Sequence, residues 1–365
     1  MALILGIEST CDETAASVVE DGVYVRSNVI ASQVELHQVY KGVVPEIASR
    51  AHIENILPVI REALEKAGCG LEDIDAIAVA QRPGLIGSLL IGVTAAKTLA
   101  WSLGKPLLGV DHVQAHLYSV ALRGSDVDTQ TATFDPRPPT PDPRPTAADP
   151  RPTLLPAIGL VCSGGHTALY QVRSWIDITR IGQTIDDAVG EAYDKVAAIL
   201  GLGYPGGPEI DKLAREGNPK AIDFPRSRLD KESLDFSFSG LKTSVLYHVR
   251  GHKGRERPAG SVTPAELRDV CASFQQACID VLLMKIRRSM KQYDARSVII
   301  GGGVSANRGL RDAMSRFELP SHFPPMQYCT DNAAMIAGLG QVLLDEGRTS
   351  DLSMDAVTSG SIPGS

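Results

Sequence analysis

Short apolar runs bounded by polar turns open the chain. Runs at residues 3–7, 16–19 and 23–25, the last two separated by Asp21-Gly22, predict three antiparallel strands. The segments that follow alternate between helix and strand, at residues 45–66 (helix), 76–80 (strand), after Pro83-Gly84 (helix), 107–110 (strand) and from about His112 (helix). This order predicts an α/β unit.

The same order returns later in the chain. Strands are expected at residues 157–162 and 166–172, joined by Ser163-Gly164-Gly165. The remaining expected elements are helices at 186–200 and 263–291, a strand at 297–300, and helices from about 307 and over 332–347. Two halves of like order predict a duplicated α/β fold with a ligand cleft between the lobes. We expect one lobe over residues 1–123 plus 326–360, and a second over 154–325.

The segment between these halves, residues 124–153, differs sharply in composition. It is rich in Asp, Pro, Arg and Thr, and the tetrad D-P-R-P recurs at Asp135, Asp142 and Asp149. Such a sequence cannot bury a core and favours extended, solvated chain. We expect residues 124–153 to be a disordered insertion.

Composition and charge restrict the class of protein. The 365 residues are 43% hydrophobic and 22% charged, which predicts a globular chain. A net charge of −7 argues against a whole surface devoted to nucleic acid, so any RNA contact should be local. The candidates, which also fit a merely solvated face, are Lys220, Arg226, Arg228, Lys231, Lys242, Arg250, Lys253, Arg255 and Arg257.

The cysteines and the N-terminal residues favour a cytoplasmic protein. The six cysteines form no C-x-x-C pair, as expected of reduced thiols, and Cys271 and Cys278 fit packing on one helix face. The start of the chain lacks the pattern of a signal peptide. We expect no apolar run close to the roughly 18 residues of a membrane span and no membrane contact.

Three glycine-rich loops indicate a nucleotide site. They lie at 163–167, between two strands, at 204–208, before a helix, and at 301–307, between a strand and a helix. Glycine lets backbone amides approach an anion closely, and ligands of α/β folds collect where strands end and helices begin. A single loop of this kind also fits an ordinary hairpin. None matches a Walker or dinucleotide fingerprint.

A histidine pair suggests a metal centre. His112 and His116 lie four residues apart in D-H-V-Q-A-H, so a helix places both imidazoles on one face. A carboxylate would complete a set that suits iron or zinc, and Asp331 is our candidate. The alternatives are that the histidines cap a helix start and that Asp331 is a helix N-cap.

Two further acidic groups stand out. The loop 8–14 carries Glu8, Asp12 and Glu13 among three hydroxyls, and could bind phosphate oxygens, a cation or water. Residues 186–194 form an acidic helix start, where Asp186 and Asp187 suit the helix dipole. Asp194, further along, is left to contact a ligand hydroxyl.

Ten stretches together resemble one family. They are G-I-E-S-T-C-D-E-T at Gly6, G-V-V-P-E-I-A-S-R-A-H at Gly42, P-G-L-I-G-S-L-L-I-G at Pro83, D-H-V-Q-A-H at Asp111, S-G-G-H-T at Ser163, D-D-A-V-G-E-A-Y-D-K at Asp186, Y-P-G-G-P at Tyr204, F-S-G-L-K-T at Phe238, G-G-G-V-S-A-N at Gly301 and T-D-N-A-A-M at Thr330. In this order they resemble the bacterial type of the TsaD family of tRNA N6-adenosine threonylcarbamoyltransferases, formerly the Gcp or O-sialoglycoprotease family. The insertion at 124–153 departs from the family pattern.

The resemblance implies a fold and a site. The fold would be the α/β, two-lobed, actin-like ATPase fold of sugar kinases, Hsp70 and actin, with a ligand cleft between the lobes. One divalent metal per subunit, Fe2+ with Zn2+ as the alternative, would be held by His112, His116 and Asp331. The residues implied to bind an acyl-adenylate are Val161, Cys162, Ser163, Gly164, Gly165, Asp194, Gly207, Asp211 and Asn307. Glu13 is our candidate for a proton-handling catalytic group.

The resemblance also implies a reaction and partners. The threonylcarbamoyl group of threonylcarbamoyl-AMP would pass to N6 of adenosine 37 in tRNAs that read codons beginning with A, forming t6A and releasing AMP. TsaB-like and TsaE-like proteins would be partners. The rival functions are a small-molecule kinase or carbamoyltransferase, an Hsp70-like switch, and a metalloprotease. Proteolysis is disfavoured because Val113 occupies the place of the glutamate in H-E-x-x-H.

Overall fold

The computed structural model describes residues 1–40, 42–124, 151–227, 229–230, 232–252, 255–256, 258 and 262–359. Contacts divide the chain into two compact units. The first comprises Met1–Ser32, Pro45–Leu154 and Asn332–Gly360, and the second comprises Gln33–Val44 and Leu155–Asp331. The boundaries expected from the sequence had left residues 33–44 and 326–331 in the first lobe. Most of the expected insertion, residues 125–150, lies outside the described residues.

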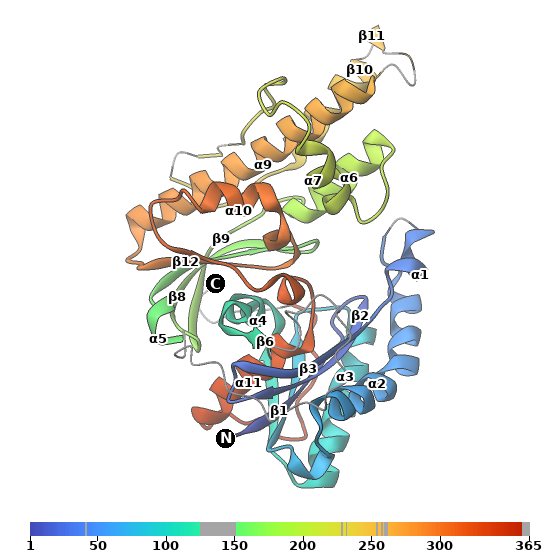
Figure 1. Cartoon of the computed structure of the whole chain (residues 1–365), viewed down its shortest axis with the longest axis vertical. Coiled ribbons are helices and arrows are strands. Elements are labelled where there is room, and N and C mark those ends of the chain that lie inside the picture. The colour runs from blue at the N-terminus through green and yellow to red at the C-terminus, as the bar shows by residue number, and fades with distance from the viewer. Residues whose placement is uncertain are drawn as a thin grey trace, which may run out of the picture. The chain divides into compact units, whose positions relative to one another are not determined.

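The first unit contains a six-stranded sheet with the order β5-β4-β1-β2-β3-β6. Figure 1 labels β1, β2, β3 and β6 of this sheet. Its strands are β1 (Leu3–Glu8), β2 (Glu13–Glu20), β3 (Tyr24–Ser32), β4 (Ala76–Arg82), β5 (Leu107–Asp111) and β6 (Arg123–Gly124). β1, β2 and β3 are antiparallel neighbours, as the opening apolar runs predict, whereas β4 and β5 continue the sheet in parallel. The helices of this unit are α2 (Pro45–Ala67), α3 (Ile86–Leu103), α4 (His112–Tyr118), α5 (Arg151–Leu154) and α11 (Ala333–Asp345).

Strand β1 shows how the sheet is covered on both faces. Neighbouring residues of a strand point to opposite faces. Leu5 and Ile7 belong to the buried cluster that contains the inner sides of α2 and α3. Gly6 faces α11 instead, where an added Cβ would lie 2.3 Å from the backbone oxygen of Ala333. The absence of a side chain at Gly6 therefore lets α11 pack directly on the strand.

Helix α3 corrects one expectation from the sequence. Its 18 residues are long and apolar enough to cross a membrane by length and composition alone, with a mean hydropathy of 1.4. The sequence-based statement that no run approaches this length is therefore wrong. Leu89, Val93 and Ala96 of this helix are buried, and a helix of a protein core passes the same test. By itself the helix is weak evidence of a membrane span.

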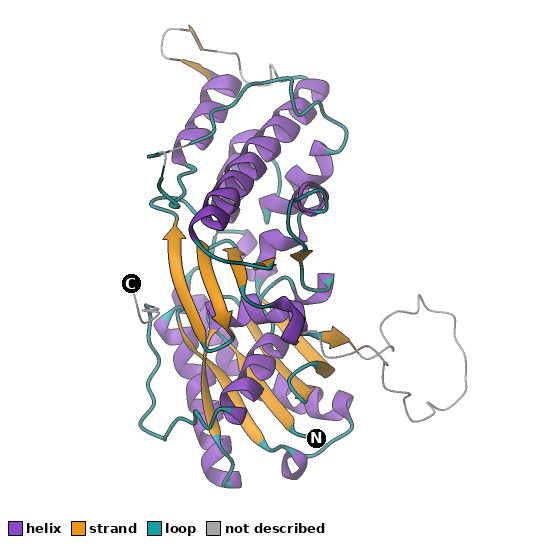
Figure 2. Ribbon diagram, turned by 90° about the vertical axis from the view of Figure 1, so that its left-hand side faces the viewer, coloured by secondary structure: helices purple, strands orange, loops and turns teal. Residues whose placement is uncertain are grey.

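The second unit contains a five-stranded sheet with the order β13-β12-β7-β8-β9. Its strands are β7 (Ala157–Cys162), β8 (Thr167–Ser174), β9 (Asp177–Gln183), β12 (Ser297–Gly301) and β13 (Ser321–His322). β7 is parallel to β12 and antiparallel to β8. Figure 2 colours the strands of the sheets orange and the surrounding helices purple.

The helices of the second unit, apart from α1, share one large buried cluster with its sheet. The helices of this unit are α1 (Val34–Gln38), α6 (Val189–Leu200), α7 (Gly206–Ala214), α8 (Ser239–Arg250), α9 (Pro264–Gln292) and α10 (Arg308–Met314). Two short strands, β10 (Gly251–His252) and β11 (Arg255–Glu256), pair with each other. The 29-residue α9 contributes Phe274, Ile279 and Leu282 to the core, and α7 and α10 both pack on it.

Candidate active site

The two histidines of D-H-V-Q-A-H lie together in the interior of the first unit. α4 begins directly after β5, and His112 and His116 are 5% and 1% exposed. Their ring centroids are 4.7 Å apart with the ring planes at 81°. Neither histidine caps the helix, because the Asp111 side chain accepts hydrogen bonds from the amides of Val113 (3.0 Å) and Gln114 (3.1 Å). The capping interpretation of the pair is therefore wrong.

Asp331 supplies a carboxylate to the same cluster. The nearest ligand atoms of His112, His116 and Asp331 all lie within 4.8 Å of one another. Asp331 is not the N-cap of α11, because the side chain of Asn332 accepts the hydrogen bond from the Met335 amide at 3.0 Å. Two imidazole nitrogens and one carboxylate oxygen are a donor set that suits Fe2+ or Zn2+ and leaves coordination positions open. The side chains present thus fit a divalent metal.

A buried glutamate touches this cluster. Glu8, the last residue of β1, has no solvent exposure, and its Oε2 lies 2.9 Å from His112 Nδ1. Its Oε1 accepts a hydrogen bond of 2.6 Å from the Thr10 amide. The sequence marked Glu8 only as one of several acids in a loop. Its contact with His112 joins residues 104 positions apart, which no local pattern reveals.

Hydroxyl groups of the loop at residues 8–14 form hydrogen bonds within the first unit. Ser9 Oγ donates to the backbone oxygen of Ser88 at 2.9 Å, and Thr14 Oγ1 lies 2.8 Å from His52 Nδ1. Both residues are fully buried, so these hydroxyls stabilise the loop. Glu13 is half-buried at the start of β2, where it accepts a hydrogen bond of 3.1 Å from Ser32 Oγ.

Two of the glycine loops of the second unit lie side by side. They follow β7 and β12, two parallel strands whose ends pair at Val161 and Gly301. Gly302 has φ +88°, and a Cβ there would lie 2.5 Å from the backbone oxygen of Cys162, so only glycine fits. At Gly164 and Gly165 an added Cβ would meet nothing within 4 Å. Packing does not explain these two glycines, whereas close approach of a ligand would.

The third glycine loop is held by Asp194. This residue of α6 accepts a hydrogen bond of 2.7 Å from the Gly206 amide, and the Gly207 amide also donates to it. Burial raises the pKa of Asp194, while the two amides act in the opposite direction. Asp194, expected to contact a ligand hydroxyl, thus has its carboxylate engaged with the first turn of α7. Gly207 itself has open space at its Cα.

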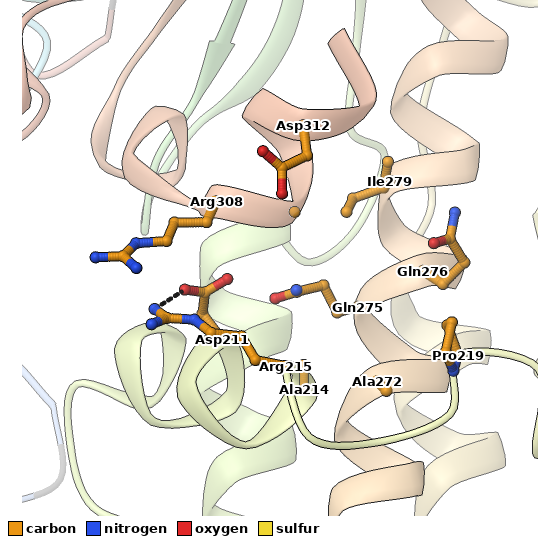
Figure 3. Close-up of a pocket in the computed structure, with 11 residues that line it drawn as sticks. Asp211, Ala214, Arg215, Pro219, Ala272, Gln275, Gln276, Ile279, Arg308 and Asp312 are labelled. Atoms are coloured by element: carbon orange, nitrogen blue, oxygen red, sulfur yellow. Dashed lines mark hydrogen bonds and ion pairs between the residues drawn. The ribbon is translucent and has the colours of Figure 1, made fainter. Parts of the chain in front are cut away.

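A cavity of about 360 Å³ lies among α7, α9 and α10 (Figure 3). Arg308 and Asp312 line it from α10, Asp211 from α7, Arg215 from the C-cap of α7, and Gln275 from α9. Asp211 is 7% exposed, and its Oδ2 accepts a hydrogen bond of 2.8 Å from Arg215 Nη2. Its Oδ1 is buried and has no hydrogen-bond partner among the described residues. A cavity of this size with an unsatisfied carboxylate oxygen suits a polar small molecule.

Asn307 is connected to this cavity. Its Nδ2 donates to Gln275 Oε1 at 2.7 Å, and its Oδ1 accepts from the Leu310 amide at 2.8 Å. The side chain therefore caps α10 and holds the Gln275 amide that lines the cavity. Asp211 lines the cavity directly, whereas Asn307 is linked to it through Gln275.

The predicted residues on β7 have different surroundings. Val161 and Cys162 are fully buried in the strand, and burial raises the pKa of the Cys162 thiol far above its usual value. Cys162 is therefore a neutral thiol and no nucleophile. Ser163 is at the surface end, where its Oγ accepts a hydrogen bond of 3.1 Å from the His166 amide. Among the described residues the six cysteines form no disulfide.

Asp186 and Asp187 have a role that the sequence did not indicate. Both precede α6, which begins at Val189 after the N-cap residue Ala188. Asp186 accepts hydrogen bonds from Ser237 Oγ (2.6 Å), Ser239 Oγ (2.7 Å) and the Phe238 amide (2.8 Å). It therefore fastens the F-S-G-L-K-T motif at the start of α8 to the loop before α6.

A sequence model of the TsaD family, described as tRNA N6-adenosine threonylcarbamoyltransferase, matches residues 24–130 and 145–338. The chain belongs to the TsaD family. A tRNA N6-adenosine threonylcarbamoyltransferase of Moorella thermoacetica is 50% identical over 340 residues, covering 91% of this chain and 89% of that protein. Proteins of the same name from Trichlorobacter lovleyi and Bacillus subtilis are 48% and 46% identical, covering 97% and 94% of this chain and 95% and 91% of their own lengths.

Solved structures place the TsaD chain in a wider fold class. HypF of T. kodakarensis matches with a TM-score of 0.58 at 15% identity, over 94% of this chain and 48% of that one. Component A of (R)-2-hydroxyglutaryl-CoA dehydratase from Acidaminococcus fermentans matches with a TM-score of 0.50 at 13% identity, over 94% and 97% of the two chains. At these identities the likeness concerns the fold alone. The expected α/β, actin-like ATPase fold is confirmed.

Proposed function

We propose that this TsaD-family chain transfers the threonylcarbamoyl group from threonylcarbamoyl-AMP to N6 of adenosine 37 in tRNAs that read codons beginning with A. The observation that carries the proposal is the 50% identity, over 91% of the chain, with a protein named for this transfer. In the reaction the N6 amine forms a bond to the carbamoyl carbon and loses a proton. The bond from that carbon to the phosphate oxygen breaks, so AMP leaves and t6A is formed.

We assign the metal site to His112, His116 and Asp331, with one divalent ion per subunit and Fe2+ preferred over Zn2+. Such an ion would supply a Lewis acid for the carbamoyl carbonyl or a nearby carboxylate. The protein's part is to keep the two imidazoles buried and at fixed angles, which α4 and its Asp111 cap provide. Support for the assignment comes from the donor set and not from the histidine spacing alone.

The donor would be bound in the second unit. The open Cα positions at Gly164 and Gly165 leave room for a polar group to approach their backbone amides. Asp211, with one oxygen unsatisfied, and the Gln275–Asn307 pair offer polar contacts at the cavity of about 360 Å³. The adenine amine is a weak nucleophile, so fixing the donor must supply much of the rate. Glu13 is proposed to receive or relay the proton.

Partner proteins have candidate surfaces on the first unit. Ile53 and Leu57 of α2 are 60% and 65% exposed and lie one turn apart, and Ile86 and Leu90 of the neighbouring α3 are 49% and 45% exposed. Exposed apolar side chains on packed helices suit a protein partner, and we assign this face to a TsaB-like protein. A TsaE-like protein is a second proposed partner. We also propose that the chain acts in the cytoplasm, where its tRNA substrate is found.

The decisive experiment is mass spectrometry of nucleosides from unmodified tRNA incubated with the chain, its partners and synthetic threonylcarbamoyl-AMP. We expect a threonylcarbamoyl mass on adenosine that disappears with His112→Ala. His322→Ala, a histidine of β13 outside the metal cluster, serves as the matched control and should retain activity. An unmodified tRNA, with folded metal-loaded protein and competent partners, would contradict the proposal and favour a small-molecule substrate.

A further inference from the structure

The buried carboxylate of Glu8 has no part in the reaction proposed above, yet it contacts a candidate metal ligand. The Glu8 side chain is 0% exposed and that of His112 is 6% exposed. A buried carboxylate is costly unless both oxygens are hydrogen-bonded. Here both are: Oε1 lies 2.6 Å from the Thr10 nitrogen and Oε2 lies 2.9 Å from His112 Nδ1.

An ionised Glu8 would set the direction of the hydrogen bond to the imidazole. The Thr10 amide can only donate, so Oε1 of Glu8 accepts. A carboxylate has no proton to give, so Oε2 also accepts, and His112 Nδ1 is the donor. A ring nitrogen that carries a proton cannot bind a metal. Nε2 then keeps its lone pair and is the nitrogen that can act as a ligand.

We propose that Glu8 is a positioning residue that holds His112 in the Nδ1-protonated tautomer and so presents Nε2 to a divalent metal ion. The inference rests on the metal site of the proposed function. Carboxylates commonly orient metal-binding histidines in this way, and their loss typically weakens metal binding 10- to 100-fold. Thr10 Oγ1 also lies near His112 Nδ1, but at 3.3 Å it is the more distant of the two oxygens.

Glu8→Gln tests the proposal because the Thr10 amide discriminates between the two ends of the new side chain. Only the amide oxygen of glutamine can accept from Thr10, so its NH2 group would face His112 Nδ1. Two N–H donors repel each other, so His112 would have to carry its proton on Nε2 instead. The substitution keeps the shape of the side chain but selects the tautomer that cannot bind metal through Nε2.

The first measurement is a titration of the metal-free full chain with Zn2+ against a chromophoric chelator. We expect zinc affinity to fall about 10- to 100-fold in Glu8→Gln. Thr10→Val keeps the backbone amide and removes the more distant oxygen, so its affinity should stay at the wild-type value. Glu20→Gln, which removes a carboxylate paired with Arg26 on the same sheet, should also leave affinity unchanged. Wild-type affinity in folded Glu8→Gln, or an equal loss in Thr10→Val, would overturn the proposal.

A second measurement needs no substitution at Glu8. Nitrogen-15 NMR of the metal-free, histidine-labelled wild-type chain, assigned by loss of one signal in His112→Asn, reports which ring nitrogen carries the proton. We expect Nδ1, and finding the proton on Nε2 would refute the role of Glu8. Neither measurement uses tRNA or the acyl donor. A chain with the expected tautomer and zinc affinity but no transfer activity would therefore contradict the proposed reaction and leave this inference intact.

Discussion

Asp194 of α6 accepts a hydrogen bond of 2.7 Å from the backbone amide of Gly206, and so ties α6 to the first turn of α7. The side chain thereby does for α7 what an N-cap residue does, because Pro205 before the helix offers no capping side chain. The same helix carries Asp211 one turn further on. We therefore expect the position of Asp211 at the cavity to depend on Asp194.

Asp194→Ala should therefore lower both stability and donor affinity. We expect a loss of about 1 kcal/mol in the free energy of unfolding, the usual cost of losing a cap, measured by urea denaturation. Binding of a non-reactive acyl-adenylate analogue, measured by calorimetry, should weaken as well. Lys212→Ala, at an exposed position on α7, is the control and should change neither. Unchanged stability in Asp194→Ala would show that the two amides do not need this carboxylate.

Substitution by alanine should affect stability at Gly302 but not at Gly164. Gly302→Ala puts a Cβ 2.5 Å from the Cys162 oxygen at a φ of +88°, so it should destabilise the chain by about 1–3 kcal/mol. Gly164→Ala meets open space and should leave stability within about 0.5 kcal/mol. If the 163–165 loop approaches the donor, Gly164→Ala should still weaken binding of the analogue. Thermal unfolding and calorimetry separate the two variants, and full affinity in Gly164→Ala would remove this loop from the donor site.

The pH dependence of stability should show the effect of the two lysines that pair with Asp187. Burial raises the pKa of this carboxyl, but Lys195 at 2.6 Å and Lys242 at 2.9 Å outweigh it, and the pKa is lowered from 3.8. A carboxyl whose pKa is lower in the folded state stabilises the fold above its unfolded pKa, and this contribution is lost as the pH falls through the folded value. Asp187→Asn should therefore lose stability at pH 7 and respond less to acid below pH 3.8.

Urea midpoints between pH 2.5 and 7 check this prediction. The control is Asp177→Asn, whose carboxylate is 52% exposed and pairs with Arg173, because exposed pairs contribute little. Parallel acid responses of wild type and Asp187→Asn would contradict the assigned sign. The two lysines bind one carboxylate from α6 and from α8, so loss of the pair should also loosen the start of α8.

The exposed face of α2 should be required for partner binding but not for folding. Leu57 is 65% exposed, so Leu57→Glu removes little buried surface and should leave the unfolding temperature unchanged. A TsaB-like partner that covers this face would meet an unpaired carboxylate, and the complex should be lost on size exclusion. Glu54→Gln, at an exposed polar position on the same helix, is the control. A complex that survives Leu57→Glu would place the partner elsewhere.

The sequence could predict features whose cause is local. β7 begins and ends at the expected residues 157–162, because a fully apolar run is closed by Ser163-Gly164-Gly165. The pairing of His112 with His116 follows from helical spacing alone. β9 and α8 were missed. β9 has an irregular burial pattern, and only Leu241 and Val245 of α8 are buried.

Contacts between segments that are distant in the chain could not be predicted from the sequence. Glu8 contacts His112 because β1 and β5 are strands of one sheet and α4 begins directly after β5. Asp186 contacts Ser237, which lies 51 positions away in the sequence. The cavity exists only where α7, α9 and α10 pack together. In each case the residue types were visible but their partners were not, since a carboxylate in a loop looks the same whether it faces water or an imidazole.

Substitution of the adjacent residues Asp331 and Asn332 should have different effects, on metal binding and on stability respectively. Asn332 is fully buried and caps α11 through the Met335 amide, so Asn332→Ala should cost about 0.5–2 kcal/mol in the free energy of unfolding. Asp331→Ala removes one of three ligand atoms, so it should abolish metal retention while the metal-free protein unfolds at the wild-type temperature. Metal analysis after dialysis and thermal unfolding with and without chelator distinguish the two. Two outcomes would contradict this division of roles between cap and ligand. One is loss of metal without loss of stability in Asn332→Ala, and the other is loss of stability without loss of metal in Asp331→Ala.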